Sequence, residues 1–309
     1  MNYCYIFGYF QVKSILSAFL YYLSLPFIYL LAFLPFPLMY GFSDLIYLLL
    51  YHVIRYRREV VRQNLRMSFP EKKLPEIDLI EKRFYHHFCD LFLETFKTLA
   101  ISKENMVKHC ELSPEAQALF DQLADERQNF IVVMGHFGNW EWGGNSFSIC
   151  CRQELSVIYH PLSNKYFDGL IYKMRTRFGT KLIAMKDTLR VVLKNRDRLS
   201  ATAFIADQTP LPDKAYWMNF LNQDTAVFPG VEKIVSKLQY PMVYVSIRKV
   251  KRGFYKIFAE KMDLPYDFRK HGVITEMHTR MLEADIRREP ENWLWTHRRW
   301  KHIRPAIIG

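Results

Sequence analysis

Residues Phe130–Gly144 read FIVVMGHFGNWEWGG, an apolar strand pattern that runs directly into a polar loop containing glycine. The run Phe130–Met134 is unbroken and rich in β-branched side chains, which is typical of a strand inside a sheet. Gly135 ends that pattern, and the loop then carries the imidazole of His136 and, five residues later, the carboxylate of Glu141. Because ligand sites of α/β sheets form where strands end, this loop is the first candidate for a functional site.

The spacing of His136 and Glu141 predicts a bent loop at this point. Five residues of continuous helix rotate by about 500°, roughly 140° net, which would point the two side chains apart. A loop that contains Gly138 can bring them together, and a histidine held by a carboxylate is what a general base needs. The i,i+4 histidine pair of a zinc helix is absent, so we expect no metal. Spacing alone leaves one alternative, a capped helix with a structural histidine in the core.

The composition describes a globular and basic protein. Of its 309 residues, 50% are hydrophobic and 24% charged, and the formal net charge is +12. Such a charge predicts attraction to nucleic acid, anionic lipid or an acidic protein. The chain has no basic low-complexity tail, no aromatic RNA-binding signature and no zinc-finger spacing, so we expect no nucleic acid. Five cysteines without a CxxC spacing predict reduced thiols and a reducing compartment.

The N-terminal residues predict a membrane anchor. Ser14–Leu34 contains no charged side chain and is about long enough to cross a bilayer core. Pro35 and Pro37 interrupt it, and Leu38–Ile54 is a second, shorter apolar segment. The arginines from Arg55 onward place the following flank on the cytoplasmic side. We expect one span and then a helix in the membrane interface, so that residues 1–54 form the anchor and 55–309 the catalytic domain. A pair of buried core helices is the alternative.

Strand and helix patterns alternate through the rest of the chain. This order predicts an α/β fold, a mixed sheet flanked by helices on both faces, with an N-terminal membrane-anchoring helix. The segment with Tyr216, Trp217 and Phe220 reads as a loop. Besides Phe130–Met134, we expect strands over Ser156–Tyr159, Leu182–Met185, Ala201–Ala206, Met242–Ile247 and Phe254–Phe258, the last two as a hairpin. We expect helices over Glu76–Ala100, from Ser113 through Leu123, and over Lys165–Phe178, Thr188–Asn195, Val231–Leu238 and Thr275–Arg287.

Several motifs in the same order resemble one known family. His136 and Glu141 match the HX4D/E motif of glycerolipid acyltransferases. The longer strings HFGNWE, YKMRTRFG, ADQTP, FPG and the terminal WLWTHRRWK are similar to those of the bacterial lipid A secondary (late) acyltransferases. The resemblance covers essentially the whole chain, including the apolar N-terminus.

The resemblance implies an acyl transfer from acyl carrier protein to a hydroxyl on a lipid A precursor. His136 would act as general base and Glu141 would fix its tautomer. Backbone N–H groups after Gly138, at the start of a helix, would hold the developing oxyanion, with Gly138 and Asn139 as the residues of this loop. The remaining matched positions would bind substrate or phosphate or brace the site: Arg175, Arg177, Asp207, Gln208 and Arg298. Trp293, Trp295 and Trp300 are interpreted as packing residues.

The resemblance also implies partners and a location. No cofactor is expected beyond the co-substrate, an acyl-carrier-protein thioester or acyl-CoA. The expected partners are acyl carrier protein, an anionic lipid acceptor and the inner membrane, with the catalytic domain on its cytoplasmic face. Two alternatives remain open. One is an acyltransferase that modifies a lysophospholipid, aminolipid or glycolipid, and the other is a non-catalytic membrane protein that binds lipid.

Overall fold

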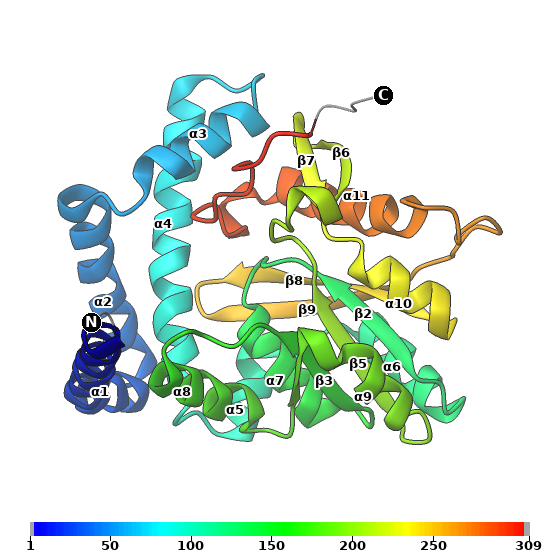
Figure 1. The fold of residues 1–309 in the computed structure, drawn as a ribbon, viewed down its shortest axis with the longest axis horizontal. Helices are drawn as coiled ribbons and strands as arrows, with labels where there is room; N and C mark the ends of the chain where they lie inside the picture. Colours follow the sequence, from blue (N-terminus) through cyan, green and yellow to red (C-terminus); the bar gives the residue numbers. More distant parts are fainter. Residues whose placement is uncertain (1–2, 306–309) are drawn as a thin grey trace.

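The structure, a computed structural model, describes residues 3–305, with side chains described from Ser17 onward. In this part of the chain, seven strands form one mixed sheet in the order β1-β9-β8-β2-β5-β3-β4 (Figure 1). Neighbouring strands are parallel except β8 and β9, which form an antiparallel hairpin. The predicted mixed α/β sheet is therefore confirmed. The strands are β1 (Cys110–Leu112), β2 (Phe130–Met134), β3 (Glu154–Tyr159), β4 (Lys181–Ala184), β5 (Ser200–Ile205), β8 (Met242–Lys251) and β9 (Phe254–Lys261).

Strand β2 lies in the middle of this sheet, and its alternating side chains enter two separate cores. Phe130 and Val132 pack with side chains of helices α6 (Pro114–Asp125) and α7 (Trp140–Cys150), whereas Ile131 and Val133 pack with those of α4 (Leu74–Lys97) and α11 (Val273–Arg288). Burial on both faces explains why the strand is a continuous apolar run, since neither set of side chains meets water. Each buried methylene contributes about 0.8 kcal/mol to this arrangement.

The helices cover both faces of the sheet, as predicted. The Ser113 hydroxyl accepts a hydrogen bond from the backbone N–H of Ala116 and caps α6, with Pro114 as its first residue. The helices of this part are α3 (Arg58–Ser68), α4 (Leu74–Lys97), α5 (Lys103–His109), α6 (Pro114–Asp125), α7 (Trp140–Cys150), α8 (Lys165–Thr176), α9 (Thr188–Lys194), α10 (Gly230–Leu238) and α11 (Val273–Arg288). Short 3-10 turns occupy Met185–Asp187, Pro212–Lys214 and Pro290–Asn292.

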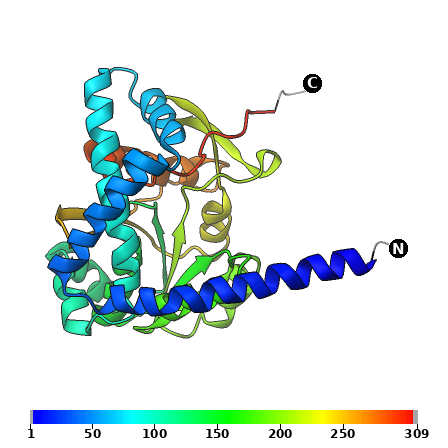
Figure 2. The ribbon, with the colours of Figure 1, turned by 90° about the vertical axis from the view of Figure 1, so that its left-hand side faces the viewer.

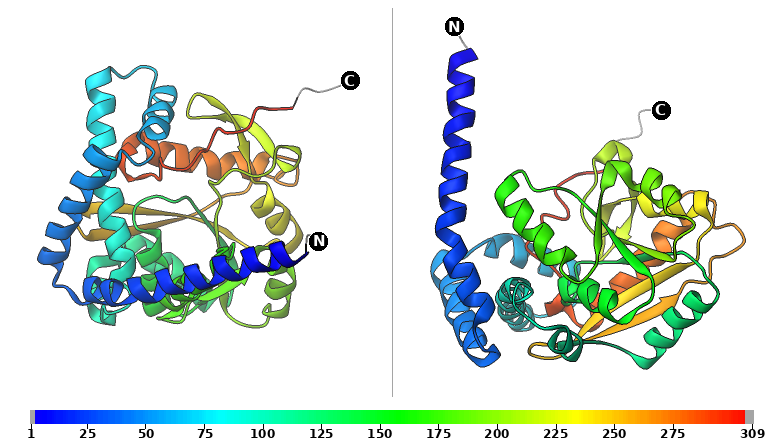
Figure 3. Two further views of the ribbon diagram at one scale, coloured as in Figure 1. Left: turned by 60° about the vertical axis from the view of Figure 1, so that its left-hand side comes forward. Right: turned by 90° about the horizontal axis from the view of Figure 1, so that it is seen from below.

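Two long helical segments form the N-terminal part. Helix α1 (Tyr3–Phe33) extends away from the sheet as a rod, and α2 (Phe36–Tyr47) continues as a π-helix over Leu48–Ile54 (Figures 2 and 3). Among the described residues, Phe36–Ile54 is long and apolar enough to cross a membrane, judged by length and composition, and Ser17–Phe33 is a shorter apolar helix. The second apolar segment therefore meets the length criterion. Our predicted span was the first segment, Ser14–Leu34, and side chains 14–16 of that segment lie outside the described ones.

Helix α2 makes several polar contacts on the side that touches the rest of the protein. The Tyr40 hydroxyl donates to Glu94 of α4 at 2.8 Å, and the Ser43 hydroxyl donates to Asp90 of the same helix at 2.8 Å. Asp44 forms a 2.7 Å ion pair with Arg252 from the turn between β8 and β9. The other side of α2 and its continuation exposes large apolar side chains, as α1 does. They are Phe19, Leu20, Leu23, Phe27 and Leu30 on α1, and Leu38, Leu45 and Leu48 on the second segment. This division is consistent with an anchor that is fastened to the catalytic part.

The segment around Tyr216 differs from the sequence-based prediction. We expected a loop, but β6 (Tyr216–Phe220) and β7 (Gln223–Val227) form a separate antiparallel hairpin. Its two-residue turn consists of Leu221 and Asn222, which have φ values of 50° and 63°. Such turns normally contain glycine at these left-handed positions, so Leu-Asn gave no recognisable hairpin signal.

Candidate active site

The loop after β2 is held in a conformation that requires glycine. Gly138 has φ +64°, and a Cβ atom at this position would overlap the carbonyl oxygen of Ile247 on β8. Its backbone N–H donates to the carbonyl oxygen of Asn292 at 2.9 Å, which ties the loop to the C-terminal segment. A bridge between Phe137 and Trp293 strengthens this junction. The loop is therefore fixed from both sides before α7 begins at Trp140.

His136 is paired with a carboxylate from another strand. The parallel register of β2 and β5 places Met134 opposite Ile205, so that the residues two positions further on, His136 and Asp207, emerge together. The Nδ1 atom of His136 lies 2.6 Å from Oδ1 of Asp207, and its backbone N–H donates to Oδ2 at 2.9 Å. The indole N–H of Trp293 donates to the same Oδ2 at 2.8 Å. Asp207 thus receives three hydrogen bonds.

The charge of Asp207 determines the tautomer of His136. Burial would raise the pKa of Asp207, but the His136 ring and the hydrogen bonds from His136 and Trp293 outweigh it and lower this pKa below its ordinary value. An ionised carboxylate only accepts, so Nδ1 of His136 must be the donor. In the neutral ring Nε2 is then the nitrogen without a proton, and the side-chain amide nitrogen of Gln208 lies 3.5 Å from it.

The expected pairing of Glu141 with His136 is wrong. Glu141 lies in the first turn of α7 and forms a two-point ion pair with Arg175 of α8, in which the Arg175 Nε atom lies 2.9 Å from Oε2. Burial acts to raise the pKa of Glu141, but Arg175 outweighs it and lowers the pKa below its ordinary value. The first turn of α7 directs Glu141 toward α8, because the helix has already begun at Trp140.

The positions expected to hold an oxyanion have other partners. The N–H of Gly138 is used by Asn292, as described above. The Asn139 side chain is fully buried, accepts from the N–H of Trp142 as the cap of α7, and donates to Glu94 at 2.8 Å. These two residues shape the loop. The N–H of Gly138 is used within the protein, and oxyanion binding by the N–H groups after Gly138 stays a prediction.

The other predicted residues fall into two groups. Arg175 and Gln208 border the same open cleft as His136, and their role in substrate binding stays a prediction. Arg177 follows α8 and donates to the carbonyl oxygen of Thr98, so it is turned toward the end of α4. Arg298 is exposed on the C-terminal segment, whereas its neighbour Arg299 is buried.

Two hollows lie side by side at this end of the sheet, and His136 borders the outer one. The open cleft has a volume of about 650 Å³ and runs between the ends of β3 and β5 and helix α8. An apolar cavity of about 50 Å³ lies deeper, between α7 and the sheet, with Gly144 and Phe147 in its wall. Val157 and Ile205 border both hollows, so the apolar cavity adjoins the cleft. Among the described residues, no three His, Cys, Asp or Glu side chains are grouped to hold a metal ion.

Sequence reasoning missed two residues that support the site. Trp293 was interpreted as packing, yet its indole N–H holds Asp207. Glu94 of α4 is fully buried and accepts hydrogen bonds from Tyr40, Asn139 and Tyr255, which connects α2, the loop and β9. A signal for Glu94 existed, since it continues the buried stripe of α4 three residues after Leu91.

Comparisons with known proteins agree with the motifs. A family model described as bacterial lipid A biosynthesis acyltransferase matches residues 11–302. The lipid A biosynthesis palmitoleoyltransferase of Escherichia coli (strain K12) is 21% identical over 270 residues, which cover 87% of this chain and 86% of the relative. The lipid A biosynthesis acyltransferase of Shigella flexneri gives the same values, 21% over 270 residues. That of Haemophilus influenzae is 20% identical over 215 residues, 69% of this chain and 66% of the relative.

Proposed function

Because the chain belongs to the bacterial lipid A biosynthesis acyltransferase family, we propose that it moves a fatty acyl chain from an acyl-carrier-protein thioester to a hydroxyl of a lipid A precursor. The acyltransferase activity follows from the family. The observation that carries the finer proposal is the His136–Asp207 pair, whose free Nε2 atom borders an open cleft. A free imidazole nitrogen at this place suits an alcohol acceptor, which is a poor nucleophile until its proton is removed.

The reaction needs one base and no covalent enzyme intermediate. Nε2 of His136 takes the proton of the acceptor hydroxyl while the hydroxyl oxygen attacks the thioester carbonyl carbon. The new C–O bond forms, the C–S bond breaks, and the leaving thiolate takes the proton from the His136 imidazolium. General base catalysis of this kind contributes typically about 10²–10⁴-fold. Asp207 stabilises the imidazolium that forms and keeps the ring oriented.

Arg175 is the group we assign to phosphate recognition. Two of its nitrogens are bound to Glu141, and among the described residues Nη1 has no protein partner. A guanidinium that is fixed in this way keeps its plane and its charge, and it presents its remaining N–H groups to an anion in the cleft. The phosphate can belong to the lipid acceptor or to the phosphopantetheine arm of the donor.

The apolar cavity beside the cleft is the place we assign to the acyl chain. Its volume of about 50 Å³ is smaller than such a chain, so its wall must widen when the acyl donor binds. Its wall is apolar throughout, and it adjoins the cleft at Val157 and Ile205. An acyl chain whose thioester carbon sits near His136 reaches this cavity past Trp140, which stacks edge-on against His136. Burial of each methylene there would contribute about 0.8 kcal/mol.

The membrane position of the protein follows the same chemistry. The family acts on lipid, and α1 and the segment Phe36–Ile54 expose apolar side chains that a bilayer would cover. We assign the catalytic part to the cytoplasmic face of the inner membrane, because Arg55 and Arg57 follow directly after Ile54. The net charge of +12 suits both an acidic carrier protein and a phosphorylated lipid.

The test is acyl transfer by the purified, detergent-solubilised protein, followed by mass spectrometry of the lipid product. Palmitoleoyl-acyl carrier protein is the first donor to try, since one relative carries that name, with palmitoleoyl-CoA beside it. A lipid A precursor, a lysophospholipid and an aminolipid serve as acceptors. We expect product only with the lipid A precursor, and at least about 100-fold less from His136→Ala.

The control is His271→Ala, a histidine whose side chain is 71% exposed and which does not border the cleft. This variant keeps wild-type activity if the effect is specific to His136. Equal activity of His136→Ala and the wild type would refute the base role. Transfer to another lipid alone would replace the acceptor, and no transfer by an intact protein would favour a lipid-binding role.

A further inference from the structure

A buried guanidinium lies behind the His136–Asp207 pair. Only 2% of Arg299 is exposed, and its Nη1 atom donates to the carbonyl oxygen of Ala226 at 2.5 Å and weakly to the Thr209 hydroxyl at 3.4 Å. Its Nε atom has no hydrogen-bond partner, and no carboxylate among the described residues lies within ion-pair distance of it. A buried charge without a partner costs several kcal/mol, so such a residue calls for an explanation.

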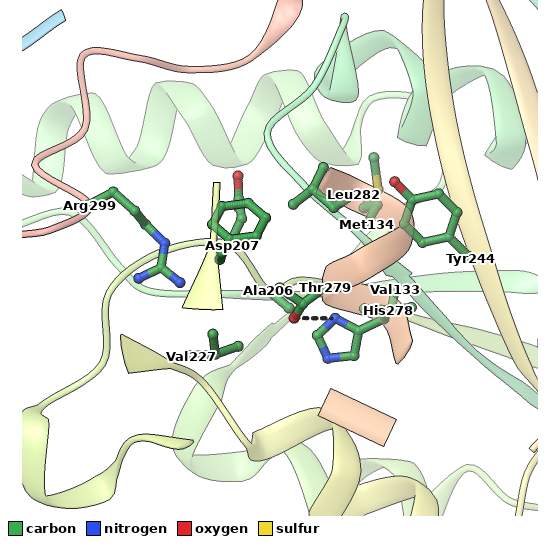
Figure 4. Close-up of a pocket in the computed structure, with 11 residues that line it drawn as sticks. Val133, Met134, Ala206, Asp207, Val227, Tyr244, His278, Thr279, Leu282 and Arg299 are labelled. Atoms are coloured by element: carbon green, nitrogen blue, oxygen red, sulfur yellow. Dashed lines mark hydrogen bonds between the residues drawn. The ribbon is translucent and has the colours of Figure 1, made fainter. Parts of the chain in front are cut away.

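Arg299 shares a small cavity with Asp207. The cavity is about 10 Å³ in volume, which is close to the space that one water molecule requires. Arg299 enters from the C-terminal segment and His278 from α11, on opposite sides of this space, with Asp207 and Val227 between them (Figure 4). The Nε2 atom of His278 likewise has no hydrogen-bond partner among the described residues.

The charges around the cavity balance only if Arg299 is counted. A general base must be neutral before it reacts, so the His136 charge that favours ionised Asp207 is absent in the resting enzyme, where the hydrogen bonds from His136 and Trp293 remain. Burial lowers the pKa of Arg299 to about 10, which leaves the guanidinium charged at neutral pH. Burial likewise lowers the pKa of His278 to about 4, so this ring is neutral. The positive charge opposite Asp207 is therefore that of Arg299.

We infer that Arg299 is a positioning residue of the proposed reaction, a buried counter-charge that keeps Asp207 ionised on His136 without touching substrate. This inference rests on the proposed role of His136 as the base. Its 2% exposure excludes direct contact with a lipid in the cleft. It predicts that loss of the positive charge makes proton uptake by the His136–Asp207 pair easier.

Other titratable groups also face this pair. They are Tyr244 from β8, whose hydroxyl donates to Asp285 of α11, His278 from α11, and His297 from the C-terminal segment, together with Glu141 and Arg175 beyond His136. Burial lowers the pKa of His297 to about 4. The Tyr244 hydroxyl is a neutral donor, and Glu141 and Arg175 neutralise one another. Arg299 remains the unpaired charge on the Asp207 side.

The experiment compares the pH dependence of kcat/KM in three proteins: the wild type, Arg299→Gln and Arg299→Lys. The glutamine variant keeps an amide donor for the Ala226 carbonyl oxygen and loses the charge, whereas the lysine variant keeps the charge. We expect the acidic limb of the Arg299→Gln profile to move to higher pH by about one unit. The lysine variant should keep the wild-type limb even if its kcat is lower. Lys301→Gln, which removes an exposed positive charge from the same segment, is the control for the limb position.

A second readout does not depend on the acceptor lipid. The proton on Nδ1 of His136 is observed by NMR in the free protein, assigned by its loss in His136→Ala, and titrated with pH. Its titration midpoint should rise in Arg299→Gln and return in Arg299→Lys. If the wild type transfers no acyl chain, the proposed function fails, while this titration still decides the role of Arg299.

A purely structural role of Arg299 predicts different results. It would lower the melting temperature of Arg299→Gln and leave both the pH limb and the titration midpoint in place, which would overturn the inference. If the glutamine variant does not fold, Arg299→Lys decides alone, and a shift of its limb by one unit would refute the counter-charge. In an Asp207→Asn background, removing the Arg299 charge should cost much less activity, because no negative charge remains to be balanced.

Discussion

Replacement of Asp207 by asparagine tests the catalytic pair at its most specific point. Two donors fix the orientation of this side chain, since the His136 backbone N–H and the Trp293 indole N–H both reach Oδ2, at 2.9 Å and 2.8 Å. An asparagine must therefore place its carbonyl oxygen at that position and its NH2 group opposite Nδ1 of His136. The imidazole then accepts at Nδ1 and carries its proton on Nε2, where the base should be.

The expected loss follows from this reversed tautomer. The Asp207→Asn variant keeps the shape of the site but removes the base and the charge that stabilises the imidazolium. We expect kcat to fall by about 10²–10⁴-fold, which corresponds to about 3–5 kcal/mol of transition-state stabilisation. KM for the lipid acceptor should change little, because Asp207 is 7% exposed and is covered by His136 and Trp293.

Steady-state acyl transfer by wild type, Asp207→Asn and Glu141→Gln provides the measurement. Glu141→Gln removes a carboxylate at the other end of the motif and leaves its Arg175 partner unpaired. It should act mainly on KM, because Arg175 is assigned to phosphate. The reasoning is refuted if Asp207→Asn retains activity within about threefold of the wild type, or if Glu141→Gln lowers kcat more than Asp207→Asn does.

The Asp207→Asn substitution also has a pH-dependent effect on folding stability. The pKa of Asp207 is lowered in the folded protein, so its ionisation stabilises the fold above the ordinary carboxyl pKa of about 4. That contribution is lost as the pH falls through the lower, folded-state pKa. The difference in unfolding free energy between wild type and Asp207→Asn should therefore be largest at neutral pH and shrink below about pH 4.

Two glycines give further predictions. Gly138→Ala should lower the free energy of unfolding by more than the roughly 1–2 kcal/mol of a left-handed residue, because its Cβ overlaps the Ile247 carbonyl oxygen. Gly179 has φ +108° with open space around it, so Gly179→Ala should show the conformational cost alone in a denaturant titration. Equal losses of unfolding free energy in the two variants would disprove the close approach at Gly138. Gly144→Ala has room for its Cβ, with Leu155 at 3.8 Å, and should narrow the apolar cavity. We expect kcat/KM for the longest accepted acyl donor to fall about tenfold relative to one shorter by two carbons. Gly169→Ala, exposed on α8, should leave the preference for acyl-chain length unchanged. An unchanged preference in Gly144→Ala would refute the assignment of the acyl chain to this cavity.

Local patterns in the sequence were enough to predict most of the fold. The apolar run Phe130–Met134 predicted a central strand because both of its faces are buried, and the Ser-Pro cap predicted the start of α6. The motif order predicted the family, which the match over residues 11–302 confirms. The hairpin β6–β7 was missed because its Leu221-Asn222 turn is stabilised by the surrounding structure rather than by glycine.

The residues of the candidate site were named from the sequence, but their partners were not. The motif itself determined that a histidine and a carboxylate leave the end of a strand within one short loop. Which carboxylate meets His136 depends on strand register, because Asp207 is 71 positions away in the chain and is brought in by the parallel pairing of β2 with β5. The early start of α7 turns Glu141 to Arg175 instead. The hydrogen bond from Trp293, which helps to lower the pKa of Asp207 against the effect of burial, arises only when the C-terminal segment closes over the sheet. The same closure buries Arg299, which has no carboxylate partner among the described residues.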